Sequence, residues 1–349
     1  LQVQQAPFFQ HPIGCGPFMV EEVNMKNYTI LAPFDKYYNG VADFKIQLLP
    51  SAGDSDPNVV TRAKSGNLDY GYTKMVADVQ ALEGTPGITV TPIDVRYTRL
   101  FYLNKFDKKD GSPAPLADVR VRQALRYAID METICETLFQ GSAVPANALA
   151  PDANLKGGDL NDYNYNPEKA KELLAEANWD PNTVIKAVYY YTDQATVDLM
   201  TAVQAYLADV GIKMEFELVE GDLATILWTA PADQTNGPRA VDWDICYAAN
   251  AALSLHEYYD RYRTGSPTNS HTPEDAELNR LIDATNASAD VNAQNEAFKE
   301  LIKYENENLF TMALYYQPIF LITSDKIGDI QKGTPQFCIN WGIQNWNVQ

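Results

Sequence analysis

Residues 184–219 read VIKAVYYYTDQATVDLMTAVQAYLADVGIKMEFELV, and this stretch decides the fold class. Its first nine residues are rich in β-branched and aromatic side chains and predict a strand. The next segment places apolar residues at helical spacing and ends at Gly211, which predicts a helix with a glycine exit. The last segment alternates with period two. A strand, helix and strand of this length predict a right-handed crossover between two parallel strands.

Helix starts elsewhere in the chain carry clear capping signals. Asp118 precedes a stripe of apolar residues at helical spacing, 121–129, and is a suitable N-cap. Asn166 and Pro167 provide a cap and a first-turn proline for another helix. A further helix is expected to begin near Asp290. These helices alternate with strands, so the chain is expected to be an α/β protein.

Two β-rich stretches are expected to connect two domains, a number that the length of 349 residues favours. The first is ITVTPIDVRYTRLFYLN, residues 88–104, which is expected to cross from one domain to the other. The second is MALYYQPIFLITSD, residues 312–325, which is expected to be a single strand that carries the chain back. Tyr315 and Tyr316 should face opposite ways along it, so that one packs while the other faces away from the core.

The chain is strongly acidic. It has 27 Lys and Arg against 46 Asp and Glu, a net charge of −19, which disfavours nucleic acid and anionic lipid as partners. No stretch reaches the length of about 18 apolar residues that a membrane span needs. The 21 tyrosines suit an adaptable binding surface, although tyrosines also line ordinary strands.

Metal and cofactor motifs are missing from the sequence. The scattered cysteines and histidines lack metal-site spacing, and they are Cys15, Cys135, Cys246, Cys338, His11, His256 and His271. We therefore expect no metal and no cofactor. One or two disulfides remain open if the protein is exported.

Enzyme signatures are also missing, since neither a G-x-S-x-G elbow nor an H-E-x-x-H helix occurs. The pairs Asp242/Asp244 and Glu215/Glu217 could serve as glycosidase carboxylates. Glu215 and Glu217 alternate with apolar residues, so we expect them on the solvated face of a strand. Cys246 lies in an apolar run and is expected in the core. No catalytic residue is predicted, and the chain is not expected to be an enzyme.

Five segments in order resemble the oligopeptide-, dipeptide- and nickel-binding proteins of ABC importers, solute-binding family 5. They are PIGCGPFM (12–19), RAKSGNLDYGYT (62–73), YLNKFDKKDGSPAPLADVRVRQALRYAIDMET (102–133), YNPEKAKELLAEANW (165–179) and YLADVG (206–211) with the strand that follows. The third is the most specific, because it is similar to the family pattern P-F-x-D-x-R-V-R-Q-A-L-x-Y-A-I-D-R. Members are longer, so the resemblance implies that the N-terminal part of the family's protein is absent here.

The resemblance implies a periplasmic-binding-protein-like type II fold, with two α/β lobes of mixed sheets joined by two crossing strands. Residues 1–97 and 318–349 would form the first lobe, which is partial, and residues 98–317 the complete second lobe. A monomer would hold a small solute, expected to be a peptide, in the cleft between the lobes and deliver it to ABC permease subunits. It would work outside the cytoplasm, in the periplasm or through a lipid anchor that lies outside this segment.

The resemblance also implies ligand-binding positions where strands end. These are Tyr72, Thr73 and Lys74 in the first lobe, residues 247–253 in the second, among them Tyr247, Ala249, Asn250 and Ala251, and Tyr316 near the return crossing. Lys74 could meet a ligand carboxylate or be an ordinary solvent-exposed lysine.

The sequence departs from the peptide-binding pattern at YAANAALS, residues 247–254, where members often carry an aspartate for the ligand's free amine. A buried ammonium needs a partner, and Asn250 offers hydrogen bonds without charge. For nickel, the few histidines provide no site. Two alternatives remain: a hydrolase on the same scaffold, and a binding receptor that serves a sensor.

Overall fold

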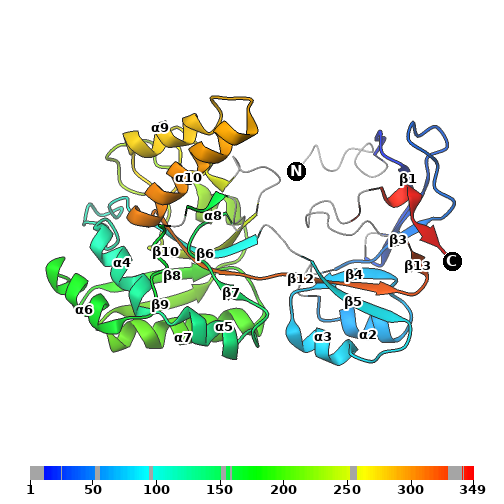
Figure 1. Cartoon of the computed structure of the whole chain (residues 1–349), viewed down its shortest axis with the longest axis horizontal. Helices are drawn as coiled ribbons and strands as arrows, with labels where there is room; N and C mark the ends of the chain where they lie inside the picture. Colours follow the sequence, from blue (N-terminus) through cyan, green and yellow to red (C-terminus); the bar gives the residue numbers. More distant parts are fainter. Residues whose placement is uncertain are drawn as a thin grey trace. The chain divides into compact units, whose positions relative to one another are not determined.

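The chain folds into two units and passes between them twice. The structure is a computed structural model that describes residues 12–24, 26–51, 56–93, 97–150, 155–157, 159–251, 258–328, 340 and 342–349. One unit comprises Leu1–Val95 and Pro318–Gln349, and the other comprises Arg96–Gln317 (Figure 1). We call them the smaller and the larger unit and describe each by itself.

The larger unit is built on a six-stranded mixed sheet. Its strands, in order across the sheet, are β7 (Val144–Pro145), β11 (Thr311–Tyr316), β6 (Tyr97–Leu103), β10 (Ile245–Ala251), β8 (Val184–Tyr189) and β9 (Lys213–Leu218). β8 is parallel to both β9 and β10, whereas β6 is antiparallel to β10 and β11. The parallel pair predicted from residues 184–219 is therefore confirmed.

The crossover helix of that pair is α7 (Gln194–Asp209). Asp193 caps its first turn, accepting a hydrogen bond from the backbone N–H of Thr196 at 3.1 Å. The helix is followed by Gly211 at φ 87°, a left-handed conformation that glycine adopts without the steric cost of a Cβ. The start and the stop of the helix thus follow from local chemistry.

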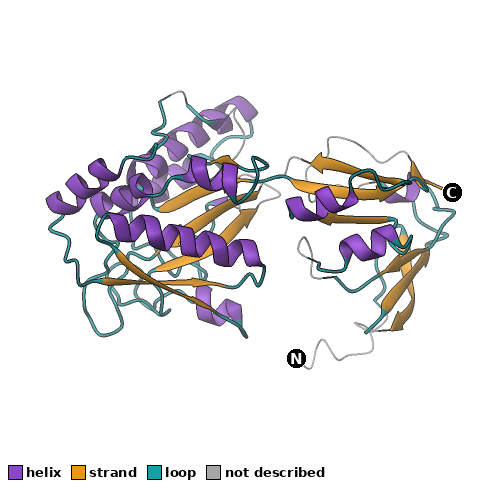
Figure 2. Ribbon diagram, turned by 90° about the horizontal axis from the view of Figure 1, so that it is seen from below, coloured by secondary structure: helices purple, strands orange, loops and turns teal. Residues whose placement is uncertain are grey.

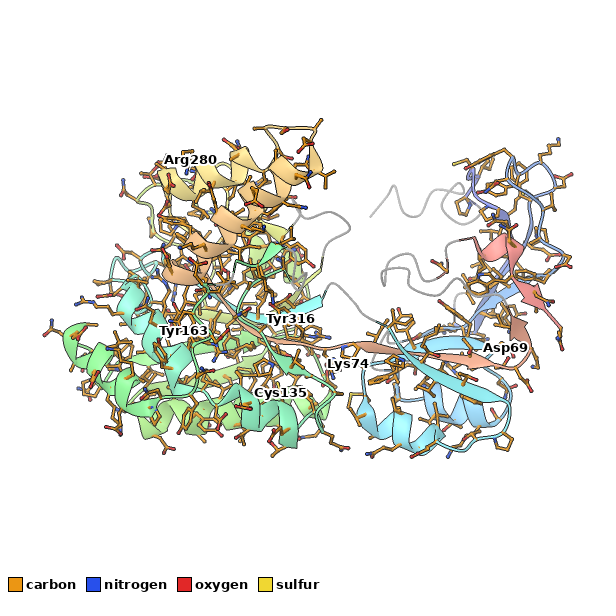
Figure 3. All side chains as sticks on the ribbon, viewed as in Figure 1. Asp69, Lys74, Cys135, Tyr163, Arg280 and Tyr316 are labelled. Carbon is orange, nitrogen blue, oxygen red and sulfur yellow. The ribbon has the colours of Figure 1, made fainter. Side chains whose placement is uncertain are left out.

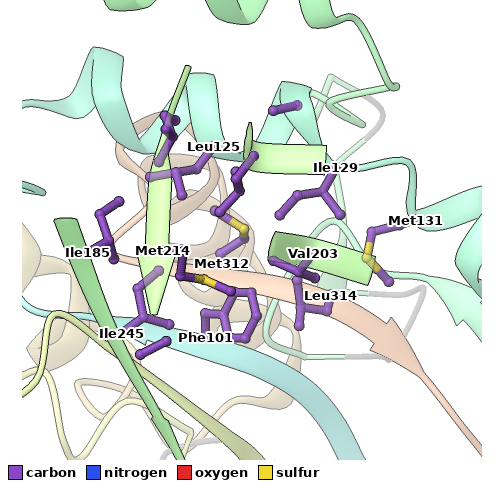
Figure 4. Close-up of a cluster of buried hydrophobic side chains, with 14 of the residues drawn as sticks. Phe101, Leu125, Ile129, Met131, Ile185, Val203, Met214, Ile245, Met312 and Leu314 are labelled. Atoms are coloured by element: carbon purple, nitrogen blue, oxygen red, sulfur yellow. The ribbon is translucent and has the colours of Figure 1, made fainter. Parts of the chain in front are cut away.

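Helices cover both faces of the sheet (Figures 1 and 2). One face carries α4 (Val119–Ala128), α5 (Met131–Thr137), α6 (Pro167–Glu176) and α7, and their apolar side chains pack with Phe101 and Leu103 of β6 (Figure 4). The other face carries α8 (Leu223–Trp228), α9 (Ala276–Ala284) and α10 (Val291–Asn308), which pack with Leu100 and Tyr102. Because successive residues of a strand point to opposite faces, β6 contributes to both cores.

The predicted helix caps are present. The side chains of Asp118, Asn166 and Asp290 accept hydrogen bonds from N–H groups in the first turns of α4, α6 and α10. Each bond satisfies a backbone donor that the helix leaves unpaired. These three starts are confirmed.

Arg122 of α4 has a structural role within residues 102–133, the third segment of the sequence resemblance. Its guanidinium is 5% exposed and donates to the main-chain carbonyls of four residues, Leu116, Ala117, Asn308 and Leu309. The last two form the exit of α10, where Leu309 has φ 44°. Arg122 therefore ties α4 to the turn that leads into β11.

The smaller unit contains two three-stranded sheets. One is β1 (Phe18–Asn24), β2 (Tyr28–Pro33) and β3 (Ile46–Leu48), and the other has the order β4 (Tyr70–Thr73), β12 (Ile319–Ser324), β5 (Ile88–Ile93). Helices α2 (Val59–Lys64) and α3 (Val76–Leu82) pack on the second sheet, while a 3-10 turn, η5 (Ile343–Asn345), and the short pair β13 (Ile327–Gly328) and β14 (Asn347–Val348) complete the unit. Among its described residues, the core cluster has only four buried members, Val59, Ala63, Leu82 and Ile322.

The expectation of one continuous strand over residues 312–325 was wrong. β11 ends at Tyr316 and β12 begins at Ile319, so Gln317 and Pro318 separate two strands that belong to different sheets. Pro318 has no N–H group to donate to a sheet ladder and restricts the residue before it. The boundary between the two units falls between Gln317 and Pro318.

Replacing Arg122 by methionine tests its role in joining α4 to α10. Because four main-chain carbonyls lose their charged donor, we expect the free energy of unfolding to fall by about 3 kcal/mol. Arg280→Ala is the control, since Arg280 forms a solvent-exposed pair with Glu277 (2.7 Å) whose loss should barely change the free energy of unfolding. Urea unfolding followed by fluorescence measures both, and equal effects would contradict the assigned role.

Candidate functional site

The carboxyl edge of the parallel strands in the larger unit is the candidate site. β8, β9 and β10 run in one direction, and β11 runs with them because both β10 and β11 are antiparallel to β6. Ligands of open α/β sheets bind outside the carboxyl ends of such strands. This edge carries the last residues of β10, Ala249 to Ala251, the last residue of β11, Tyr316, and the start of β6.

Tyr316 holds the segment that follows β7. Its hydroxyl donates to the carbonyl of Ala148 at 2.7 Å and accepts a hydrogen bond from Lys156 Nζ at 2.8 Å. The Lys156 ammonium also lies 4.2 Å from the centre of the Tyr316 ring. Burial raises the pKa of Tyr316, so the phenol stays protonated at physiological pH. Tyr316 is half-buried and provides the predicted site with a side chain at the surface.

Tyr247 lies in the core instead of at the surface of the edge. Its hydroxyl is 2.7 Å from the hydroxyl of Tyr315, and its ring contacts that of Tyr191, with centroids 5.7 Å apart. Tyr315 is itself buried against Phe139. Burial raises the pKa values of both phenols, Tyr247 and Tyr315. Tyr315 therefore packs while Tyr316 reaches the other side.

Arg99 is a charged residue at this edge that was not among the predicted site residues. It is 4% exposed, is paired with Ala249 and Tyr315 in the sheet register, and lies over the Tyr191 ring at 4.8 Å. A charged residue inside the otherwise apolar and aromatic strand YTRLFYL was the available signal. Charges in buried strands need a specific environment, which makes them candidates for function.

Asn250 is nearly buried and donates from its amide to the carbonyl of Tyr258 at 2.9 Å. This bond joins the end of β10 to Tyr258, the first residue described after position 251. Ala249 is half-buried beside it, and Ala251 is the last residue of β10. Residues 252–257, including the predicted position Leu253, lie outside the described residues.

The predicted residues of the smaller unit lie at the end of β4. The Thr73 hydroxyl donates to Asp78 at 2.6 Å and accepts from the N–H of Met75 at 3.0 Å, so it organises the start of α3. Lys74, labelled in Figure 3, is 7% exposed, so the alternative of a solvent-exposed lysine was wrong. Tyr72 is half-buried in β4.

Three of the four carboxylates considered for catalysis, Glu217, Asp242 and Asp244, form ion pairs instead. Glu217 and Asp242 both lie within 3.1 Å of Lys186 Nζ, and Asp244 pairs with Arg239 at 2.6 Å. Glu215 and Glu217 are exposed, which confirms the solvated strand face. Cys246 is fully buried, as expected for a core residue.

Three titratable side chains, Glu305 of α10, Lys105 and His271, are buried in the core of the larger unit. Burial raises the pKa of Glu305 to about 8 and lowers the pKa values of Lys105 and His271. Lys105 donates to the carbonyls of Leu103 and Phe310 at 2.6 and 2.8 Å. All three titratable side chains are under a tenth exposed, so a substrate in solution does not reach them.

Cys15, Cys135 and Cys246 carry free thiols, and Cys338 lies outside the described residues. In the described part of the chain, no group of three or more His, Cys, Asp and Glu side chains is placed to hold a metal ion. No helix within the described ranges has both the length and the apolar character needed to cross a membrane.

Comparison with known proteins identifies relatives of this chain. The model of the "Bacterial extracellular solute-binding proteins, family 5 Middle" matches residues 2–272. A putative ABC transporter peptide-binding protein of Brucella ovis is 29% identical over 208 residues, which is 58% of this chain and 38% of that protein. The oligopeptide-binding protein AppA of Bacillus subtilis is 26% identical over 272 residues, 72% of this chain and 46% of that protein. The matches thus span less than half the length of these relatives.

Solved structures show the same fold. A putative peptide binding protein AppA from Clostridium difficile superposes with a TM-score of 0.80 at 17% identity, covering 99% of this chain and 70% of that chain. NikZ from Campylobacter jejuni, solved with Ni(L-His), gives 0.79 at 16% identity, also over 99% and 70%. The predicted α/β fold of the type II periplasmic-binding-protein class is confirmed.

The buried Glu305 carboxyl makes stability depend on pH. Its pKa is about 8 in the folded chain against 4.5 for the unperturbed group, so the folded state binds the proton more tightly. The free energy of unfolding should therefore fall as pH rises from about 4.5 to about 8, by on the order of 4 kcal/mol, and level off above. Glu305→Gln should remove this slope.

Glu307→Gln is the matched control, because Glu307 is exposed on the same helix. Urea unfolding at a series of pH values measures all three proteins. If the free energy of unfolding of the wild-type protein changed with pH as it does in Glu305→Gln, the role assigned to Glu305 would be wrong.

Proposed function

Because the chain belongs to the bacterial extracellular solute-binding proteins of family 5, we propose that it is the solute-holding part of an ABC importer's binding protein. Its ligand is a peptide or a similar small solute, which it delivers to the permease subunits. The observation that carries the proposal is the family match over residues 2–272, joined to a sheet edge with polar and aromatic side chains. We further propose that it works outside the cytoplasm as a monomer, either in the periplasm or lipid-anchored to the outer face of the membrane.

The edge supports binding more than catalysis. The pKa of the Tyr316 phenol is raised, so it stays protonated, and the nearby carboxylate of Asp193 is used to cap α7. Protonated phenols, an amide and cations offer hydrogen bonds and charge to a ligand but no activated nucleophile. The protein therefore holds its ligand without converting it.

We assign different roles to the predicted site residues. Tyr316 and Ala249 contact the ligand, and Ala251 ends the strand β10 beside them, while Asn250 and Tyr247 fix the backbone and the tyrosine cluster behind them. In the smaller unit, Lys74 and Tyr72 contact the ligand, and Thr73 holds the turn into α3. In this proposal the smaller and the larger unit correspond to the first and the second lobe that the family resemblance implies.

A peptide mixture with one matched pair of variants tests the proposal. A tryptic digest of casein should raise the thermal midpoint of the wild-type protein, because a ligand that binds only the folded state stabilises it. Tyr316→Phe should weaken binding by about 5- to 10-fold, since the hydroxyl bonds to Ala148 and Lys156 are lost.

Tyr165→Phe serves as the control, because Tyr165 is exposed at the start of α6. The masses of the digest before and after incubation should be identical. New cleavage products would favour a hydrolase, and the absence of any shift with any peptide would count against the proposal.

A further inference from the structure

Three basic side chains of the larger unit lie over aromatic rings in segments around the candidate site. Arg99 lies 4.8 Å from the Tyr191 ring centre, Lys156 4.2 Å from Tyr316, and Arg261 4.1 Å from Trp228. Tyr191, Trp228 and Arg261 belong to the connections that follow β8, β9 and β10, and Tyr316 ends β11. The chain as a whole has a net charge of −19, so cations held on aromatic rings in these connections stand out against an acidic surface.

Arg261 is the most informative of the three. It is half-buried in the turn at residues 259–262, and Trp228 is the last residue of α8. Burial raises the pKa of Tyr102 to about 12, and the positive charge of Arg261 opposes that rise, so its charge reaches the sheet. In the part of the chain that the structure describes, no carboxylate lies within 4.0 Å of its guanidinium, in contrast to Arg263, which pairs with Asp283.

Acidic residues in the same connections serve the helices. Asp193 accepts from the N–H of Thr196 in α7, and Asp222 accepts from the N–H of Thr225 in α8. Glu220 is exposed beyond the edge strand β9. Among the described residues, the Arg261 guanidinium contacts the ring of Trp228, and it forms no ion pair with a carboxylate.

A guanidinium that lies over an indole ring keeps its N–H groups, which point outward in the guanidinium plane, able to donate hydrogen bonds to a ligand. The aromatic face offsets part of the cost of removing the cation from water, and the fork matches a carboxylate with two hydrogen bonds. Stacking also fixes the orientation of a side chain that otherwise loses entropy upon binding.

We propose that the solute held by this protein is anionic, an acidic peptide or a similar small carboxylate, and that Arg261 on Trp228 binds one of its carboxylates. Arg99 and Lys156 add positive charge at the sheet edge. The proposal rests on the proposed function and names its ligand class. It agrees with the sequence YAANAALS at the end of β10, which lacks an acid to pair with a ligand ammonium.

Matched tripeptides test the charge preference on the whole protein as its gene encodes it. Ala-Glu-Ala, Ala-Gln-Ala and Ala-Lys-Ala have the same length and backbone, and calorimetry gives their affinities. We expect the glutamate peptide to bind at least about 10-fold more tightly than the glutamine peptide, as for a desolvated charge pair. The ratio should shrink between about 50 mM and about 500 mM salt, since screening weakens charge pairs.

Arg261→Gln should reduce the preference for glutamate over glutamine to within about 3-fold. Arg263→Gln is the matched control two residues away, and it should keep the preference because Arg263 already has Asp283 as its partner. Equal thermal midpoints without ligand would show that both variants fold.

Two results overturn the inference alone. One is tight binding of the glutamine or lysine peptide at the level of the glutamate peptide, and the other is an unchanged preference in Arg261→Gln. Failure of all three peptides and of the casein digest to bind contradicts the proposed function as well, so the two failures are distinguishable.

Discussion

The structure of the larger unit depends on the pairing of β6 along both of its edges. β6 is antiparallel to β10 on one side and to β11 on the other, so segments about 150 residues and more apart in sequence meet at one strand. Both faces of β6 are buried, with Phe101 in one core and Tyr102 in the other. Its first residues carry Arg99 to the sheet edge, so the same pairing that builds the cores also positions the candidate site.

Local chemistry made the helices and the parallel pair predictable. The caps of α4, α6, α7 and α10 are set by residues within one turn, and the alternation of β9 follows from its position at an edge of the sheet. The order of the strands was not predictable, because β6 pairs with β10 and β11, which are distant from it in sequence. The break at Pro318 was visible in the sequence, and the alternating pattern around it led to the wrong expectation of one strand.

The site was less predictable than the fold, because burial depends on neighbours from elsewhere in the chain. Tyr247 looked like a ligand contact from its place at a strand end, but its face of the strand is the core face, where it meets Tyr315. Arg99 and Arg261 were not selected, since their rings, Tyr191 and Trp228, lie about 90 and 30 residues away in sequence. Sequence spacing reveals caps and periods, whereas cation–π pairs of this kind appear only in three dimensions.

The account assigns framework and specificity to different parts of the chain. Arg122 of α4 stabilises the framework by donating hydrogen bonds to main-chain carbonyls. The connections after the strands carry Arg261 and Trp228, to which we assign ligand specificity. Its central claim is that the protein holds a small solute and releases it chemically unchanged. Native mass spectrometry of the whole protein purified from its own cells, repeated after prolonged incubation, tests this most directly. The account predicts one small bound molecule whose mass stays constant, and a bound molecule that is progressively cleaved, or none at all, would contradict it.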